Sequence, residues 1–460
     1  FKASKRKIFK MNYKSTRNNQ VIFTSEQVLN YGLAPDGGLF VPELLPSFSQ
    51  DQIKSLNGSS YYDIANFIMQ PFLTDLFSEE EIKTIIKEAY SSFDKEIVSL
   101  TPMGENHLLN LFHGPTLAFK DYAMSLLAKI YEYYLEKQNK KLVIIGATSG
   151  DTGSAAIQAF KGIKNIKIFI LHPHNSTSLF QRKQMTTSGA DNVFNIALNG
   201  SFDDCQTLVK QCFQDQTINQ NFNLTAINSI NWFRVLPQSI YYAWSFLNHD
   251  IKSFVVPSGN FGNIYSAYVL RKMGFPLKDL VIATNENNIL HRIIKNNDFS
   301  LHDVVKTNSP SMDITISSNF ERLLCDFISP SDLDDLYQKM PNNKHSKSIN
   351  SEIHEQLSQK FLSISVNSSE VEKQIERLYK NLNILIDPHT AVGAMGAEKL
   401  KLKNVACLAC AHPVKFQETV RQSLQHDIQY DKNFKFDQNE EFNVLDNNYL
   451  LLKEYIQNHA

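Results

Sequence analysis

From residue 142 onward, short apolar runs alternate with glycine-containing turns and stretches of helix-forming residues. The runs that read as strands lie at 142–145, 166–171, 193–197, 254–256, 280–283 and 405–411. Apolar strands that alternate with helices are typical of parallel sheets covered by helices on both faces. The sequence therefore predicts an α/β fold.

The chain length predicts more than one domain. At 460 residues the chain exceeds the size at which a single core stops growing, and two or three domains are expected. We assign residues 11–100 to an N-terminal domain, preceded at 1–10 by an extension or a cloning remnant. The small α/β domain is expected at 138–249. The large domain is expected at 101–137 and 250–460, with a polar, helical surface excursion at 326–382.

The charge of the chain offers no general attraction for polyanions. Lys and Arg number 46 and Asp and Glu 47, so the formal net charge is -1, and neither nucleic acid nor a membrane surface is an expected partner. No run approaches the roughly 20 apolar residues that cross a bilayer, and the N-terminus lacks the apolar part of a signal peptide. With five cysteines, an odd and sparse set, these features predict a soluble protein in the reducing cytoplasm.

Two of the cysteines, Cys407 and Cys410, have the spacing of a metal or redox motif. They lie in an apolar, strand-like run without a second cysteine pair, so we interpret them as buried strand residues. No metal site is predicted.

Two glycine turns each join a predicted strand to a predicted helix. Their sequences are Thr148-Ser149-Gly150-Asp151-Thr152-Gly153 and Ser258-Gly259-Asn260-Phe261-Gly262-Asn263. Glycine lets the backbone approach a ligand closely, and the free N–H groups at a helix start favour an anion. Neither turn is a dinucleotide fingerprint, and neither has the lysine of a P-loop. The two turns indicate anion sites of another kind, with plain connections as the alternative.

A lysine lies at the start of a further predicted helix, in the segment HGPTLAFKD at 113–121. The neighbours Leu117, Ala118 and Phe119 would surround Lys120 with apolar groups, which disfavour an ammonium ion and suit an amine that forms an imine. A solvated lysine at a helix start is the alternative interpretation.

Ordered blocks along the chain resemble those of one family, the threonine synthases. The segment around Lys120 looks like the cofactor-lysine motif of that family, and other blocks follow in family order. They are YKSTR at 13–17, GGLFVP at 37–42, ATSGDTG at 147–153, QMTT at 184–187, FDDCQ at 202–206, NSINW at 228–232, SGNFGN at 258–263, ATNEN at 283–287, SPSMDI at 309–314, SSNFERLL at 317–324, PHTAVG at 388–393 and AHPVKF at 411–416. The resemblance covers nearly the whole chain from Met11 to about Gln425. It implies fold type II of the pyridoxal-phosphate enzymes, with the cofactor between a large and a small α/β domain.

The resemblance also implies roles for individual residues. Lys120 is implied to bind pyridoxal 5'-phosphate as an imine, and the turn at 258–263 to cradle the cofactor phosphate. Cys410 occupies the position that faces the pyridine nitrogen, where the family usually has Thr. The turn of Thr148, Ser149, Gly150, Asp151 and Thr152 resembles the loop that receives the carboxylate of the substrate.

The reaction implied by the resemblance converts O-phospho-L-homoserine and water into L-threonine and phosphate, by γ-elimination and addition of water at Cβ. Lys120 would then be the acid and base for the Cα and Cβ protons. The substrate phosphate needs its own pocket, because two dianions repel each other. The candidates for that pocket are Lys14, Ser15, Thr16, Arg17, Asn231 and Arg234, each with a surface salt bridge as the alternative.

Three departures from the family pattern keep alternatives open. They are Cys410, Asn175-Ser176 in place of a glycine and a basic residue, and Phe233 in place of a small residue. One alternative is a phospho-lyase that acts on phosphohomoserine or phosphothreonine and gives 2-oxobutanoate, ammonia and phosphate. Another is a non-catalytic binding relative, whose expected signature would be loss of the lysine or of a turn. A monomer or a dimer is expected.

Overall fold

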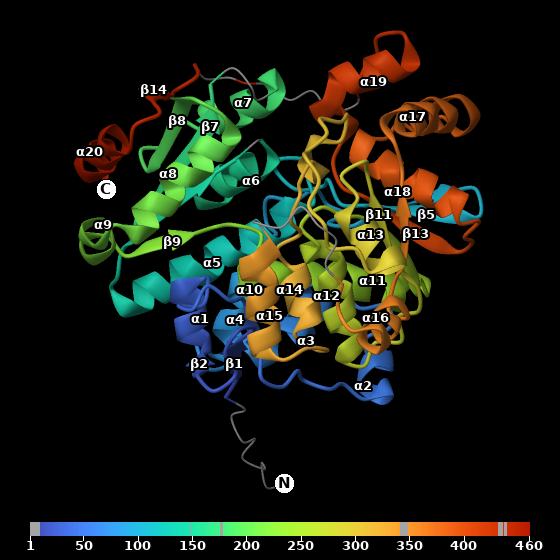
Figure 1. The fold of residues 1–460 in the computed structure, drawn as a ribbon, viewed down its shortest axis with the longest axis horizontal. Coiled ribbons are helices and arrows are strands. Elements are labelled where there is room, and N and C mark those ends of the chain that lie inside the picture. The colour runs from blue at the N-terminus through green and yellow to red at the C-terminus, as the bar shows by residue number, and fades with distance from the viewer. Residues whose placement is uncertain (1–9, 149, 175–177, 341–347, 431–435, 437–438) are drawn as a thin grey trace, which may run out of the picture.

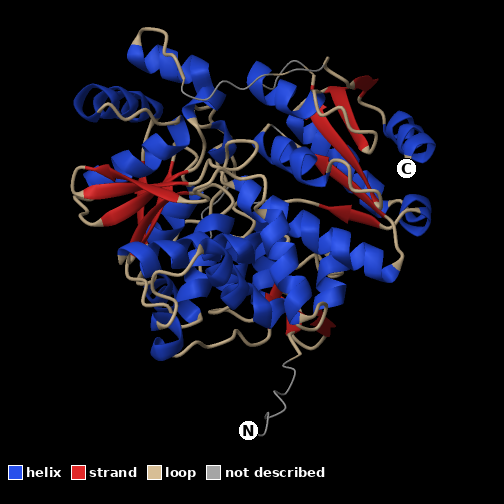
Figure 2. Cartoon of the chain, turned by 180° about the vertical axis from the view of Figure 1, so that it is seen from behind, coloured by secondary structure: helices blue, strands red, loops and turns tan. Residues whose placement is uncertain are grey.

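The computed structural model of the chain describes residues 10–148, 150–174, 178–340, 348–430, 436 and 439–460 (Figure 1). These residues form a three-stranded, a six-stranded and a five-stranded sheet. Seen from behind in Figure 2, the two larger sheets are separate groups of strands with helices between and around them. The α/β fold predicted from the alternation of strands and helices is confirmed.

The N-terminal segment contains a small antiparallel sheet that the sequence reading did not predict. Strand β1 (Asn12–Ser15) lies between β2 (Ile22–Thr24) and β3 (Phe40–Pro42). Four helices follow these strands or lie between them: α1 (Ser25–Tyr31), α2 (Gln50–Lys54), α3 (Tyr61–Leu73) and α4 (Glu79–Ala89). Thr24, Ser49 and Ser78 begin α1, α2 and α4 with reciprocal capping bonds, which satisfy N–H groups at the start of each helix.

The six-stranded sheet has the order β12-β11-β10-β13-β5-β4 and is parallel except between β4 and β5. Its strands are β4 (Ser99–Met103), β5 (Asn106–Asn110), β10 (Ser253–Pro257), β11 (Leu280–Thr284), β12 (Leu362–Ser365) and β13 (Val405–Ala409). Side chains along β10 alternate between two cores: Phe254 and Val256 belong to one and Val255 to the other. Both faces of this sheet are therefore buried, as the apolar runs predicted.

The five-stranded sheet is wholly parallel and has the order β14-β8-β7-β6-β9. Its strands are β6 (Leu142–Ala147), β7 (Ile166–Pro173), β8 (Val193–Asn199), β9 (Leu224–Ala226) and β14 (Asn443–Asp446). Ile144 faces the main core of the molecule, whereas Val143 and Ile145 face a separate core that also contains Leu452.

Helices fill the space around the two larger sheets (Figure 1). They are α5 (Lys120–Gln138), α6 (Asp151–Phe160), α7 (Leu179–Thr186), α8 (Phe202–Gln214), α9 (Gln216–Asn221), α10 (Trp232–Val235), α11 (Ser239–His249), α12 (Gly262–Lys272), α13 (Ile289–Asn296), α14 (Phe320–Leu324), α15 (Pro330–Lys339), α16 (Ser351–Ser358), α17 (Ser368–Leu382), α18 (Pro388–Lys399), α19 (Gln417–Leu424) and α20 (Tyr449–His459). In the described part of the chain, none of them is long and apolar enough to cross a membrane.

Two strands lie where the sequence did not predict them. The segment 326–382, predicted to be a helical excursion, contains strand β12, which pairs with β11 at the edge of the large sheet. The C-terminal segment, predicted to belong to the large domain at 250–460, contributes β14 to the five-stranded sheet beside β8. Both strands are short and half-exposed edge strands, so they lack the continuous apolar run by which the central strands were found. The remaining domain limits stay predictions.

Candidate active site

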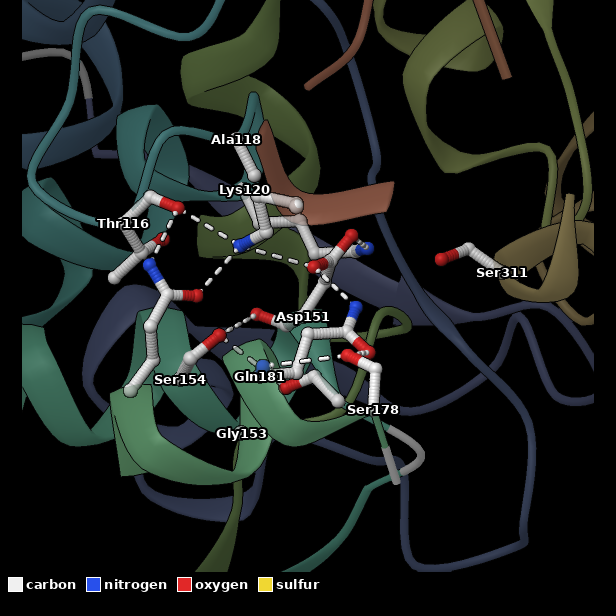
Figure 3. Close-up of polar contacts among 12 residues, drawn as sticks. Thr116, Ala118, Lys120, Asp151, Gly153, Ser154, Ser178, Gln181 and Ser311 are labelled. Carbon is white, nitrogen blue, oxygen red and sulfur yellow. Dashed lines mark hydrogen bonds and ion pairs between the residues drawn. The ribbon is translucent and has the colours of Figure 1, made fainter. Parts of the chain in front are cut away.

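Lys120 is the first residue of α5 and its side chain is 13% exposed. Its Nζ donates to Asp151 Oδ2 over 3.2 Å. Asp151 is the first residue of α6, directly after the turn that follows β6. The two residues come from segments more than 30 positions apart, and Figure 3 shows their side chains turned toward each other.

Asp151 is a buried carboxylate that accepts from several groups. Gln181 Nε2 donates to its Oδ1 over 2.8 Å, and Lys415 Nζ lies 3.0 Å from the same oxygen. Burial by itself raises the pKa of Asp151, but the ammonium charges of Lys120 and Lys415 outweigh it and hold that pKa well below the usual range. Asp151 is therefore ionised in the folded protein.

Backbone hydrogen bonds join the lysine segment to the large sheet. Phe119 N donates to Cys410 O over 2.8 Å, directly after β13, and His412 N donates to Leu117 O. Since β13 and β10 are neighbouring parallel strands, Cys410 and the turn that begins at Ser258 follow their carboxyl ends at the same edge of the sheet. Ligands of open α/β sheets bind outside that edge.

The turn at 258–263 has the geometry of an anion cradle. Phe261 has a φ of 64°, and α12 starts at Gly262. The N–H groups of Gly259, Asn260 and Phe261 donate to no group among the described residues. A Cβ on Gly259 would lie 3.2 Å from Ser311 O and from Met312 Cα, so a side chain would crowd the turn.

Asn263 adds a buried polar atom without a partner to this turn. Its Oδ1 accepts from the hydroxyls of Tyr241 and Tyr242, while its Nδ2 has no hydrogen-bond partner among the described residues. Free N–H groups at a helix start bind phosphate well. The turn therefore fits the phosphate group of pyridoxal phosphate. The hydroxyl of Ser258 donates to Val256 O.

Cys410 is a buried neutral thiol. Its Sγ donates weakly to Leu408 O over 3.6 Å, and its N–H donates to Thr390 Oγ1. Burial, followed by the nearby charge of Asp387, raises the pKa of the thiol well above its ordinary value. The second cysteine of the spacing, Cys407, is buried within β13.

The turn at 148–153 is closed by its own threonine. Thr148 Oγ1 accepts from Gly150 N over 3.0 Å and from Gly153 N over 2.9 Å. A Cβ on Gly150, whose φ is 151°, would lie 2.6 Å from Gln181 Cδ. Thr152 is half-buried in the first turn of α6. Ser149 lies outside the described residues, as do Asn175 and Ser176.

Three of the residues predicted to bind the substrate phosphate already contact carboxylates. Ser15 Oγ donates to Asp36, Thr16 Oγ1 donates to Glu321, and Arg17 donates to both oxygens of Glu321 over 3.0 and 2.9 Å. The hydroxyl donors of Ser15 and Thr16 and two of the guanidinium nitrogens of Arg17 are therefore used in these contacts.

Asn231 and Arg234 are both buried. Asn231 Oδ1 caps α10 through Phe233 N, and Arg234 donates to Ile227 O over 2.8 Å. Asn231 Nδ2 and Arg234 Nε are buried without a partner among the described residues. Burial lowers the pKa of Arg234 to about 10. Lys14 lines a cavity of about 230 Å³ together with Arg322 and Lys272.

Several residues at the site were missed from the sequence. Gln181 and Gln184 come from α7, and Lys415 follows β13 in a short 3-10 helix. His389 accepts from Ser311 N at Nε2 and contacts Asp387 at Nδ1. Gln184, Ser311, His389 and Lys415 all occur inside the quoted blocks, but nothing in the spacing of those blocks indicated a contact.

Family models match the chain along most of its length. A model of the N terminus of threonine synthases matches residues 12–90, a model of pyridoxal-phosphate-dependent enzymes matches 108–410, and a model of the C-terminal region of threonine synthases matches 390–456. Together with the fold and the site, these matches define a pyridoxal-phosphate-dependent enzyme of fold type II.

Individual relatives identify the family within this class of enzymes. The threonine synthase of Pseudomonas aeruginosa is 41% identical over 427 residues, covering 90% of each chain, and that of Saccharomyces cerevisiae is 38% identical, covering 90% of this chain and 89% of that protein. The structure of a PLP-bound threonine synthase from Brucella melitensis superposes with a TM-score of 0.93 at 37% identity, covering 98% of this chain and 99% of that chain. The chain belongs to the threonine synthase family.

Proposed function

We propose that this enzyme converts O-phospho-L-homoserine and water into L-threonine and phosphate, with Lys120 as its central residue. The observation that carries the proposal is the buried contact between Lys120 and Asp151, at the sheet edge where the anion-binding turn at 258–263 begins. When bound, pyridoxal phosphate withdraws electrons from the carbons next to the substrate amino group. The protein must then hold the reactants and move protons.

Lys120 is proposed to bond to the cofactor aldehyde and, once released, to move protons at Cα and Cβ. Its position at the start of α5 supports this role, because the packed helix fixes the backbone from which the amine reaches into the site. Asp151 orients the amine through the 3.2 Å contact. No other carboxylate lies within ion-pair distance of Lys120 among the described residues.

The two turns are proposed to bind different anions. The N–H groups at 259–263 would hold the cofactor phosphate, and the turn at 148–152 would receive the substrate carboxylate. Cys410 would face the pyridine nitrogen as a weak hydrogen-bond group.

For the substrate phosphate, Asn231 is the best supported candidate. Its Nδ2 has no partner in the part of the chain that the structure describes. Its segment borders the turn at 258–263, since Asn319 donates through its side chain to Ser229 O and through its backbone to Asn260 O. Ser15, Thr16 and Arg17 are less well supported, because Asp36 and Glu321 already accept their hydrogen bonds.

Product analysis tests the reaction. The enzyme loaded with pyridoxal phosphate and incubated with O-phospho-L-homoserine is expected to release threonine and phosphate in equal amounts. Release of 2-oxobutanoate and ammonia instead would contradict the proposal and identify a phospho-lyase. The cytoplasmic location, the lack of a nucleic-acid partner and the monomeric or dimeric state stay predictions from the sequence.

A further inference from the structure

The turn proposed to receive the substrate carboxylate contains a carboxylate of its own. Asp151 is buried, with only 5% of its side chain exposed, and it is ionised. Two like charges 4 Å apart repel by about 4 kcal/mol at the effective dielectric constant of a protein site. An anionic substrate therefore binds beside Asp151 only if a cation compensates this charge.

Lys120 cannot supply that compensation throughout the reaction. It is the residue proposed to bond to the cofactor, and a bonded nitrogen is no longer a free ammonium group. Lys415 is the other cation within ion-pair distance of Asp151 among the described residues.

The ammonium group of Lys415 is fully buried and has three acceptors. Its Nζ lies 3.0 Å from Asp151 Oδ1 and donates to Thr116 O over 2.8 Å and to Gln184 Oε1 over 2.9 Å. An ammonium group has three N–H donors, so each one has a partner. None is left over for a ligand, and the side chain is 0% exposed.

The acceptors of Lys415 come from different parts of the fold. Thr116 lies in the segment that leads to Lys120, Asp151 begins α6, and Gln184 is in α7. Lys415 itself follows the central strand β13 of the large sheet. Its ammonium group therefore contacts segments from both sides of the site. Lys120, His389 and Cys410 are the other titratable groups that face Asp151.

We propose that Lys415 is a positioning residue that balances the charge of Asp151 and thereby lets an anionic substrate bind beside it. The inference rests on the proposed function, because it takes the turn at 148–152 as the site of an anion. Lys415 acts through Asp151 and does not touch the substrate.

Three variants separate this role from direct binding. Lys415→Met leaves the negative charge of Asp151 without its compensating cation, and Asp151→Asn leaves the positive charge of Lys415 without its carboxylate. The double variant removes both charges. Compensation predicts that the second substitution repairs the first, whereas a lysine that binds the anion directly cannot be repaired in this way. Lys403→Met is the matched control, since Lys403 is 70% exposed.

Propanoate, a simple carboxylate, is the probe of the turn at 148–152, and its affinity for the protein loaded with pyridoxal phosphate is measured by calorimetry without turnover. Lys415→Met is expected to weaken propanoate binding by about tenfold or more, and the double variant is expected to return to within about threefold of the parent protein. Lys403→Met should match the parent. A double variant that binds as weakly as Lys415→Met would overturn the proposal.

Thermal unfolding of the same variants gives a second readout. Removal of one partner from a buried ion pair destabilises a protein more than removal of both, so the double variant is expected to melt at a higher temperature than Lys415→Met. If Lys415→Met does not fold, the double variant is compared with the parent protein. Propanoate binding that is more than about tenfold weaker in the double variant contradicts the proposal. Product analysis is independent of these measurements, so a failure of the proposed reaction is recognised separately.

Discussion

Asp121 holds the loop from which Lys120 projects. It is buried beside Lys120 in α5, and its carboxylate accepts from Thr116 N over 2.8 Å and from Thr116 Oγ1 over 2.5 Å. Burial raises the pKa of Asp121 to about 6, although the bonds from Thr116 and the charge of Lys415 oppose this rise. The loop is thus built around a carboxyl group that resists ionisation in the folded state.

This raised pKa predicts a pH dependence of stability. The unfolded carboxyl ionises near its usual pKa of about 3.9, whereas the folded one stays protonated up to about 6, so folding is favoured most below pH 4. Relative to Asp121→Asn, the free energy of unfolding of the parent should fall by about 2 kcal/mol between pH 4 and pH 6. Urea unfolding at several pH values measures this difference, and parallel curves for the two proteins would contradict it.

Cys410 gives a second prediction at the residue scale. Cys410→Thr is expected to keep cofactor affinity and kcat/KM at or above the parent values, because a hydroxyl is a stronger hydrogen-bond group than a thiol. Cys410→Val, of similar size, should lose about tenfold in cofactor affinity, since it removes the polar group. Absorbance titration with pyridoxal phosphate and steady-state kinetics measure both effects. A large loss in the Thr variant would mean that the site is adapted to the thiol.

Turns between strands and helices form the ligand sites at the element scale. The backbone at 258–263 follows β10, and its close approach to Ser311 and Met312 depends on Gly259. Because the crowding atoms there belong to the backbone, they cannot rotate away from an added methyl group.

Gly259→Ala is therefore expected to displace the turn and to weaken binding of pyridoxal phosphate by about tenfold, or roughly 1.4 kcal/mol. Gly146→Ala is the matched control, because its Cβ would meet Ile170 and Ile227 only at ordinary contact distances of 3.7 Å. Equilibrium titration of the cofactor-free proteins measures both affinities. Equal affinities in the two variants would contradict the role of the turn.

The central strands and both turns could be predicted from the sequence, because continuous apolar runs and glycine turns are local signals. The sequence places strands at 142–145 and 280–283, and the structure has them at Leu142–Ala147 and Leu280–Thr284. Strands β9 and β14 have three and four residues, too few to give such a signal. Their pairing depends on contacts with β6 and β8 from distant parts of the chain.

The contacts within the active site were also only partly predictable from the sequence. Lys120 and the turn at 258–263 were found through blocks of adjacent residues. The contact of Asp151 with Lys415 joins positions more than 260 residues apart, and no local pattern in the sequence predicts which buried lysine compensates which carboxylate. Only the folded chain, which brings the ends of two sheets together, reveals that contact.

At the scale of the whole molecule, the C-terminal segment completes the small sheet. Strand β14 pairs with β8 (Figure 1). Leu452 and Ile456 of α20 belong to the same buried cluster as Leu208 and the cysteines of α8. Glu440, just before this strand, forms a bidentate ion pair with Arg182 of α7. The end of the chain therefore supports the helix that carries Gln181 and Gln184.

Leu452→Ala is accordingly expected to lower the free energy of unfolding by about 2–5 kcal/mol, because the side chain is 1% exposed. Leu450→Ala, in the same helix but 70% exposed, should change it by less than about 0.5 kcal/mol. Urea unfolding of both variants tests the contrast. Similar stability of the two would mean that α20 is not part of the folded core.

The account as a whole depends on a bond between Lys120 and pyridoxal phosphate. Reduction of the cofactor-loaded protein with borohydride makes this bond permanent, and peptide mass spectrometry then locates it. We predict a pyridoxyl group on the peptide that contains Lys120, and no such group on Lys415 or in the Lys120→Ala variant. A modified lysine elsewhere, with Lys120 unmodified, would contradict the central claim.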